Sequence, residues 1–166
     1  TEYTSEGELI PLDRPRKILM IQDGATRAGY WDGNVSRHLN PTPSPGEFTV
    51  EGFDETMIGL WMKWSNNRLW LSHNGKVMAS DLGNPLKFKD AQVLNEGRAF
   101  YIGDDCTGMT ETADAKGLIV FTGIRGFLFQ SHVQDRTIWL DMENFQSIIF
   151  PKTGCVAPRS IVVQYG

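Results

Sequence analysis

The chain has 166 residues, of which 40% are hydrophobic and 22% are charged, and this composition excludes an intrinsically disordered protein. Its 16 basic and 20 acidic residues give a net charge of −4, which argues against nucleic acid as the default binding partner. No apolar run approaches the roughly 20 residues that a membrane-spanning helix needs.

The N-terminal part of the chain is punctuated by prolines and turn residues. Residues 1–16 are polar and contain two prolines, so they are expected to form an extended arm. Apolar stretches at 17–22 and 30–31 flank a turn and predict a first hairpin. A proline-rich linker follows at 40–46, and the short apolar segment 57–64 is compatible with either a strand or a helix.

The clearest hairpin of the chain lies next. Two apolar stretches, 68–72 and 76–80, flank the dipeptide Asn74-Gly75. This pair is typical of a primed two-residue turn, in which both residues take positive φ angles. The sequence therefore predicts two antiparallel strands joined by a tight turn at Asn74 and Gly75.

The C-terminal half continues with short apolar segments. Residues 109–115 could form a strand or a single helical turn, and 118–131 predict a third hairpin with glycines in its turn. Residues 136–140 and 146–150 are predicted as strands, and 160–165 as the start of another. No window has the apolar spacing of a long amphipathic helix, so an all-β protein is expected.

The three hairpins recur with a period of about 50 residues, which is typical of β-propeller blades. The sequence therefore predicts antiparallel, propeller-like blades, about three of a larger ring, within a partial domain spanning 17–166. The predicted units are 17–66, 67–116 and 117–160, and a further unit would begin at 160–166.

Both chain ends suggest a piece of a longer polypeptide. The first residue is Thr1, and the chain stops within the strand-like segment that ends at Gly166. Because a ring normally needs at least four blades, exposed strand edges should remain and recruit neighbouring strands. These strands would come from the rest of the polypeptide or from other subunits, so the isolated chain is expected to aggregate or assemble and not to behave as a compact monomer.

Residues with catalytic or metal-binding chemistry are scattered. Asp104-Asp105 lies in a glycine-flanked loop that could hold calcium, but it lacks the ligand spacing of an EF-hand, so a solvated turn is favoured. His38, His73 and His132 have no carboxylate or cysteine at metal-ligand spacing. Nucleophile-elbow, phosphate-loop and dinucleotide-binding motifs are missing. The sequence predicts no catalytic, cofactor-binding or metal-binding residue, and hence no enzyme and no cofactor.

The two cysteines do not form a metal or redox motif. Cys106 and Cys155 are far apart in the chain, and neither belongs to a C-x-x-C pair. Two buried thiols that pack as small hydrophobic groups are favoured, and a disulfide between them remains open.

The aromatic residues are expected to fill the space between packed sheets. Five tryptophans and nine phenylalanines are present. Trp31 and Trp64 lie next to turns, and they are the candidates for exposed, ligand-binding aromatics.

Several phrases of the sequence resemble the propeller-type tail tubular or nozzle proteins of tailed bacteriophages. These phrases are Asn67-Arg-Leu-Trp-Leu followed by Gly75-Lys-Val-Met-Ala-Ser-Asp-Leu-Gly-Asn-Pro-Leu-Lys-Phe88, Asp23-Gly-Ala-Thr-Arg27 with Tyr30-Trp-Asp-Gly33, and Gly154-Cys-Val-Ala-Pro-Arg-Ser-Ile-Val162. Ala28 stands where that family often has proline. The resemblance extends over most of the chain and carries no catalytic residue.

The resemblance implies a non-enzymatic component of a virion tail, assembled in the host cytoplasm. Its partners would be other copies of itself in a ring and neighbouring tail proteins, with DNA passing through the ring during ejection. The mildly acidic net charge suits such a conduit, because a channel that held phosphates tightly would slow their passage.

Two other functions remain as alternatives. A carbohydrate- or receptor-binding propeller module would use exposed loop aromatics. A glycoside hydrolase fragment would need two carboxylates that converge about 5 to 10 Å apart. The available carboxylates lie on separate predicted turns: Asp81, Asp104, Asp105, Asp135 and Asp141.

Overall fold

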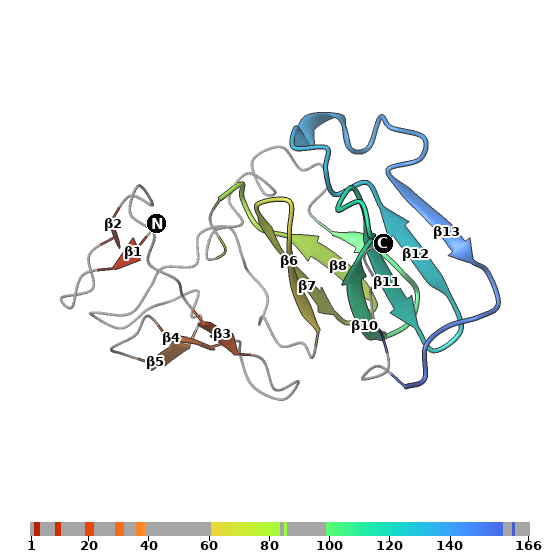
Figure 1. Cartoon of the computed structure of the whole chain (residues 1–166), viewed down its shortest axis with the longest axis horizontal. Helices are drawn as coiled ribbons and strands as arrows, with labels where there is room; N and C mark the ends of the chain where they lie inside the picture. The colour runs from red at the N-terminus through yellow and green to blue at the C-terminus, as the bar shows by residue number, and fades with distance from the viewer. Residues whose placement is uncertain are drawn as a thin grey trace.

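Antiparallel β-structure dominates the part of the chain that the structure describes (Figure 1). The computed structural model describes residues 2–3, 9–10, 19–21, 29–31, 36–38, 61–83, 85, 99–157 and 161. Every strand pair among these residues is antiparallel, and their helical structure is a single short 3-10 turn. The predicted all-β, antiparallel class is therefore confirmed.

The N-terminal strands are short. In the segment predicted as an extended arm, β1 (Glu2–Tyr3) pairs with β2 (Leu9–Ile10). Strands β3 (Leu19–Ile21), β4 (Gly29–Trp31) and β5 (Ser36–His38) form a three-stranded sheet in that order. The predicted first hairpin corresponds to the pairing of β3 with β4. The proline-rich linker 40–46 lies outside the described residues.

The next sheet contains four strands in sequential order. These are β6 (Met62–Ser65), β7 (Arg68–His73), β8 (Lys76–Ala79) and β9 (Phe100–Tyr101). The segment 57–64, open between strand and helix, thus contributes a strand. Asn74 and Gly75 have φ angles of 46° and 68°, which confirms the primed turn between β7 and β8. Asn66 and Asn67 form a second turn of this kind, with φ angles of 48° and 60°.

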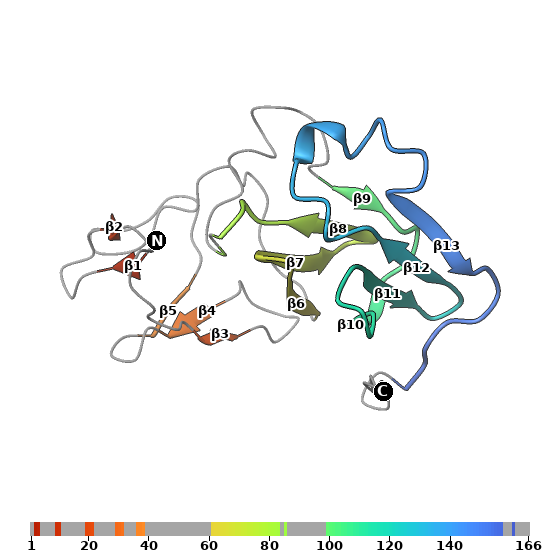
Figure 2. The ribbon, with the colours of Figure 1, turned by 45° about the horizontal axis from the view of Figure 1, so that its top comes forward.

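The last sheet repeats this four-stranded order. Its strands are β10 (Cys106–Glu111), β11 (Leu118–Thr122), β12 (Gly126–Phe129) and β13 (Gln146–Phe150). The strand option is confirmed for 109–111, whereas 113–116 form a turn, and the predicted strand at 146–150 is confirmed. Residues 102–105 alone connect β9 with β10 (Figure 2).

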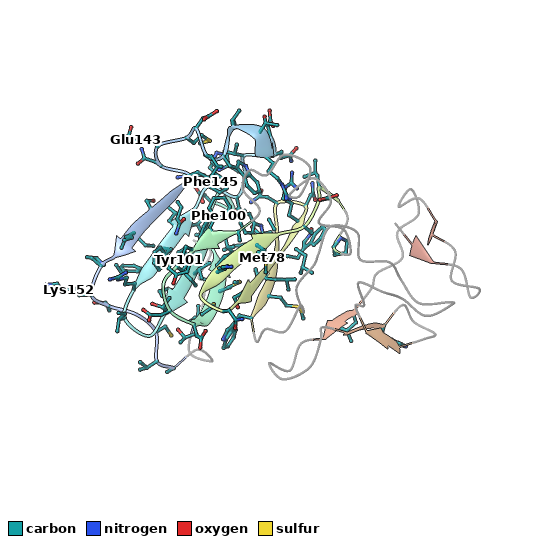
Figure 3. The ribbon with its side chains drawn as sticks, turned by 180° about the vertical axis from the view of Figure 1, so that it is seen from behind. Met78, Phe100, Tyr101, Glu143, Phe145 and Lys152 are labelled. Atoms are coloured by element: carbon teal, nitrogen blue, oxygen red, sulfur yellow. The ribbon has the colours of Figure 1, made fainter. Side chains whose placement is uncertain are left out.

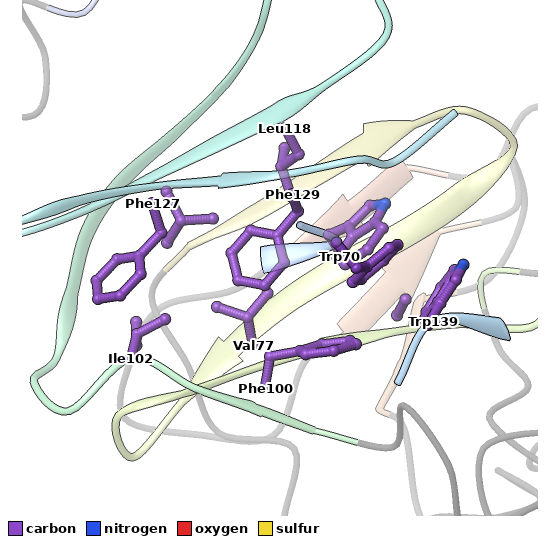
Figure 4. Packing of buried hydrophobic residues seen from close by; sticks show 11 residues of the cluster. Trp70, Val77, Phe100, Ile102, Leu118, Phe127, Phe129 and Trp139 are labelled. Atoms are coloured by element: carbon purple, nitrogen blue, oxygen red, sulfur yellow. The ribbon is translucent and has the colours of Figure 1, made fainter. Parts of the chain in front are cut away.

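The two four-stranded sheets share one hydrophobic core. Buried and partly exposed residues alternate along β11, as expected for a strand with one face on a core. The buried side chains of both sheets point toward one another (Figure 4). The cluster consists of Trp70, Val77, Ala79, Phe100, Ile102, Leu118, Val120, Phe127, Phe129, Trp139 and Phe145.

The prediction that aromatic side chains fill the core is confirmed for Trp70 and Trp139. Trp70 and Trp139 are buried and stack with ring centroids 5.6 Å apart. Trp31 and Trp64 are 44% and 45% exposed, as expected from their places next to turns. The aromatic side chains thus supply most of the core volume between the sheets.

One predicted strand is wrong. Residues 136–140 were expected to be extended, but Arg136–Ile138 form the 3-10 turn η1. Asp135 caps this turn, because its carboxylate accepts hydrogen bonds from the backbone N–H of Thr137 at 3.0 Å and from its hydroxyl at 2.6 Å. The turn brings both Arg136 and Trp139 into the interior, which a straight strand with alternating faces does not do.

The predicted propeller is not seen as such. The described sheets are open and do not close into a ring. The sheets span 62–101 and 106–150, so each begins one strand before its central hairpin, whereas the repeat units were drawn from the hairpins at 67 and 117. The hairpin turns are the strongest signal in the sequence, so the unit boundaries were drawn at the hairpins. The strand before each hairpin, β6 or β10, was therefore assigned to the preceding unit. The predicted strand at 160–165 falls almost wholly outside the described residues.

The central strands β7 and β8 of the β6–β9 sheet have buried side chains on both faces. Trp70 faces the β10–β13 sheet, whereas Leu69 and Leu71 alternate with it and are also buried. Met78 lies opposite Leu71 and is 5% exposed. Apolar side chains of β7 and β8 are therefore buried on both sides of the sheet.

The turn at Asn74 and Gly75 gives a direct test of this hairpin. A Cβ on Gly75 would make only ordinary contacts of 3.6 to 3.7 Å, so Gly75→Ala isolates the cost of the φ angle of +68°. We expect a loss of about 1 to 2 kcal/mol in the free energy of unfolding, measured by urea denaturation. Gly123→Ala, at a turn glycine with open space around it, is the control and should change stability less. Equal effects would contradict the turn geometry.

Candidate functional site

Four buried polar residues lie where β8 leaves its sheet, namely Arg68, Ser80, Asp81 and Arg136. Ser80 follows β8 and is fully buried. Its backbone N–H donates to the Leu69 carbonyl oxygen, and its hydroxyl accepts a bond from the Leu69 N–H, both at 2.8 Å. These bonds continue the β7–β8 pairing by one residue and hold the Ser80 backbone in place.

Two buried arginines converge on the carbonyl oxygen of Ser80. Arg68 donates to it from Nη1 at 2.7 Å, and Arg136 donates to it from Nη2 at 2.6 Å. Arg68 also donates to the carbonyl oxygen of Gln134, and Arg136 to that of Ala79. Both side chains are less than 5% exposed. We call Ser80, Arg68, Arg136 and Trp139 the Ser80 node.

Trp139 completes the node from the side of the β10–β13 sheet. The guanidinium carbons of Arg68 and Arg136 each lie 5.2 Å from its ring centroid, within the range of a cation–π contact. Its indole N–H donates to the carbonyl oxygen of Val133 at 2.8 Å. It stacks on Phe145, and Phe145 lies beside Phe100 in the view of Figure 3.

The node connects segments from both sheets. Arg68 belongs to β7, whereas Gln134 and Arg136 lie in the connection between β12 and β13. Arginine is suited to this position, because its planar group stays charged and donates along several directions at once. The four hydrogen bonds named above all end on backbone carbonyl oxygens of the same chain, so the arrangement is a structural joint.

A second polar joint lies at the β6–β7 turn. The Asn66 side chain donates to the Ala115 carbonyl oxygen and to the Ser131 hydroxyl, both at 2.9 Å. The hydroxyls of Ser65 and Ser131, both buried, lie 3.2 Å apart. The tight turn of one sheet is thereby bonded to the hairpin and to the strand end of the other.

The segment after β13 folds back onto the β11–β12 turn. The Cys155 N–H donates to the Thr122 carbonyl oxygen at 3.0 Å. A Cβ on Gly154 would collide with the backbone of Thr122, Gly123 and Ile124. Only glycine permits this approach. The Gly154-Cys155 pair of the phage-tail resemblance therefore has a structural role here.

The scattered chemical groups stay apart in the structure. Asp104 and Asp105 are exposed in the loop between β9 and β10, in agreement with a solvated turn. The described residues contain no group of three or more His, Cys, Asp or Glu side chains that could hold a metal ion. His132 is exposed, and its Nδ1 lies 2.6 Å from the Lys116 carbonyl oxygen. The side chains of His38 and His73 lie outside the described part of the structure.

The carboxylates considered for a glycoside hydrolase lie on different turns. Asp81 is nearly buried beside the Ser80 node, Asp135 caps η1, and Asp141 follows that turn. The pKa of Asp135 is lowered by the hydroxyl and then the backbone N–H of Thr137. The pKa of Asp114 is lowered by the hydroxyl of Thr112 and the backbone N–H of Lys116. Asp135 and Asp114 therefore favour the ionised state.

The two cysteines are free thiols. Each is half-buried, and Cys106 packs against the core. Burial raises the pKa of Cys106 from 9.0 to about 11, although the Ser72 hydroxyl favours the thiolate. The expectation of two thiols without a disulfide is thereby supported, and Cys106 behaves as a small hydrophobic group.

No family model, curated protein or solved structure matches the chain. Among the described residues, no helix is long and apolar enough to cross a membrane.

The sequence analysis missed both arginines of the node. Arg68 begins a strand whose following residues are apolar, and Arg136 lies in an apolar stretch that was assigned as a strand. An arginine inside an apolar run is the signal that could have identified them, because such a charge must find partners when it is buried. Their common acceptor, the Ser80 carbonyl oxygen, is a backbone atom and leaves no trace in the sequence.

Removal of Arg136 tests the node. Arg136→Ala deletes two charge-assisted hydrogen bonds and a contact with Trp139, so we expect a loss of about 3 to 5 kcal/mol in unfolding free energy. Arg136→Lys keeps the charge but loses the planar group, and should recover only part of this loss. Arg125→Ala, at a half-exposed arginine in the β11–β12 turn, is the matched control. Equal urea midpoints for Arg136→Ala and Arg125→Ala would contradict the node.

The reactivity of Cys106 tests its burial. In a Cys155→Ser background, a disulfide reagent at pH 8 should modify the folded protein about 100-fold more slowly than the urea-unfolded protein, because the raised pKa depletes the thiolate. The Cys106 thiol ionises at a lower pH in the unfolded protein than in the folded protein. The contribution of Cys106 to the free energy of unfolding is therefore fully present below pH 9.0 and declines as the pH rises toward about 11. Equal rates in both states would show that this thiol is not buried.

Proposed function

We propose that the chain is a non-enzymatic structural module of a bacteriophage tail, part of the tube or nozzle ring through which DNA is ejected. The observation that carries this proposal is that residues of the resembling phrases make structural contacts. The carbonyl oxygen of Ser80, within the Ser-Asp-x-Gly phrase, accepts hydrogen bonds from both buried arginines. Gly154 allows the segment after β13 to pack closely on the β11–β12 turn. Contacts that hold the two sheets together support a structural role in a virion.

The sheet arrangement supports the same proposal. Two four-stranded sheets of sequential strand order follow one another with a short connection and pack face to face. Propeller blades have this order and this packing. A closed ring would then need further sheets, contributed by other copies of the chain or by additional polypeptide. We propose neighbouring tail proteins as the remaining partners and the virion as the location.

An alternative function is the recognition of carbohydrate or of another receptor. Three exposed aromatic side chains favour it, namely Trp31, Trp64 and Tyr101, which is 68% exposed. Aromatic rings of this kind can stack on sugar rings. Binding on a glycan array that is lost in Tyr101→Ala and kept in Leu140→Ala would support this function over the first.

The proposed function predicts where the protein is found. Particles purified from a lysate of the host strain that carries the gene should contain this chain as a virion protein, detected by mass spectrometry at a constant ratio to the major capsid protein. An abundant host protein serves as the contamination control. Purified infectious particles without the chain would refute the tail function.

A further inference from the structure

The outer face of the β10–β13 sheet carries apolar side chains. Ile119 and Phe121 alternate with the buried residues of β11, so they lie on the face opposite the core. Leu128 is paired with Ile119 in the register of β11 and β12 and therefore shares this face. Phe150 stacks on Phe121 with ring centroids 6.1 Å apart, and it is 42% exposed. We call Ile119, Phe121, Leu128 and Phe150 the outer apolar face.

The corresponding face of the β6–β9 sheet is covered by the strands that follow it in the chain. Trp70 and Val77 lie on that face and are fully buried. After β9 the chain leads into β10, and the side chains of Cys106 and Met109 pack against the same core cluster. The strand that continues the chain thus begins the cover over the preceding sheet.

A contact with the central hairpin turn directs the chain from β9 to β10. The Ile102 N–H donates to the carbonyl oxygen of Gly75, in the β7–β8 turn, at 2.8 Å. A Cβ on Gly75 would lie 3.6 Å from the carbonyl carbon of Gly103, so the two backbones are in close contact. Strand β10 begins four residues after Ile102. The connection is therefore anchored on the turn before the covering strand starts.

The segment after β13 is anchored in the same way. The Cys155 N–H donates to the carbonyl oxygen of Thr122, at the β11–β12 turn, at 3.0 Å, and Gly154 permits the close approach of the backbones. In Figures 1 and 2 the chain after β13 turns back across the end of the sheet toward β10. Four residues after Cys155 comes Arg159, directly before the strand predicted at 160–165. The anchor and the offset of the first connection are thus repeated.

We propose that residues 160–165 pack in extended form on the outer apolar face of the same chain, as β10 packs on the β6–β9 sheet. Their sequence, Ser-Ile-Val-Val-Gln-Tyr, carries no charge, which suits an apolar surface. In extended form they span about 20 Å, enough to cover the five-residue strand β11. Ile161, the residue of this segment that the structure describes, is half-buried. The inference does not depend on the proposed function, since the contact lies within one chain.

Attachment favours this segment over a partner from solution. Cys155 is bonded to Thr122, the residue after Phe121, so the residues that follow Cys155 start at the border of the outer apolar face. A segment on a short tether has an effective concentration in about the millimolar range, which exceeds that of a partner at micromolar concentration. The cover should therefore be present in the isolated protein and should not depend on protein concentration.

Hydroxyl-radical labelling followed by mass spectrometry tests this contact in the full chain. In the parent protein Phe121 and Phe150 should label more slowly than in the urea-unfolded chain, and equally so at about 1 and 50 μM, because the cover is tethered. Ile161→Asp places a charge in the apolar contact, so labelling of both phenylalanines should rise by about threefold or more. Gly154→Ala should act in the same direction, because it displaces the anchor and leaves 160–165 unchanged.

Controls separate loss of the cover from loss of the fold. Val156→Asp places the same charge on a residue that is 86% exposed, and it should leave the labelling at the level of the parent protein. Trp70 and Trp139, in the core between the sheets, report folding in the same measurement and must stay protected. If Ile161→Asp exposes them, Val163→Asp replaces it, since Val163 lies on the same side of an extended segment.

The outcomes distinguish this segment from other occupants of the face. Unchanged labelling of Phe121 and Phe150 in Ile161→Asp would overturn the proposal. Labelling of the parent protein as fast as that of the unfolded chain would overturn it too, because the face would then be uncovered. Protection that grows with protein concentration would assign the cover to a second copy and would likewise refute the contact within one chain.

Discussion

Two buried guanidinium groups share the Ser80 carbonyl oxygen, and the stacking of the two sheets depends on this contact. Arg68 reaches it from β7 at 2.7 Å, and Arg136 reaches it from the connection between β12 and β13 at 2.6 Å. A buried charge without partners costs several kcal/mol. Moving the segments that supply the acceptor oxygens away from the two arginines would therefore be strongly unfavourable. Because both cations also lie over Trp139, polar and aromatic parts of the joint have to form together.

The Ser80 node explains how two small sheets joined by a short connection can share one hydrophobic core. Residues 102–105 link the sheets at one end, whereas the Ser80 node and the Asn66 bonds to Ala115 and Ser131 hold them at other points. The aromatic cluster between the sheets supplies the apolar burial that dominates stability. The hydrogen bonds then fix which residues of the two sheets face one another, a task that the non-directional hydrophobic effect does not perform.

The sequence predicted individual hairpins and strands better than it predicted how the sheets pack together. Asn74-Gly75 was sufficient for the β7–β8 hairpin, because a tight turn with positive φ angles depends on two residues alone. Residues 136–140 were wrongly assigned as a strand, because their apolar pattern is also satisfied by a capped turn that buries Arg136 and Trp139. The Ser80 node could not be predicted, since its acceptors are backbone oxygens brought together only by folding.

Native-state hydrogen exchange tests most directly whether the two sheets form a single unit held by the node. Amide exchange is measured residue by residue in increasing, sub-denaturing urea, for amides of β7, β8, β11 and β12. If the node couples the sheets, the backbone amides of Trp70 and Val120 will exchange through an opening of the same free energy. Arg136→Ala will then lower this opening free energy for both amides by the same amount. If the β10–β13 sheet opens at a clearly lower free energy while the β6–β9 sheet stays protected, the sheets are independent and the central role of the Ser80 carbonyl is contradicted.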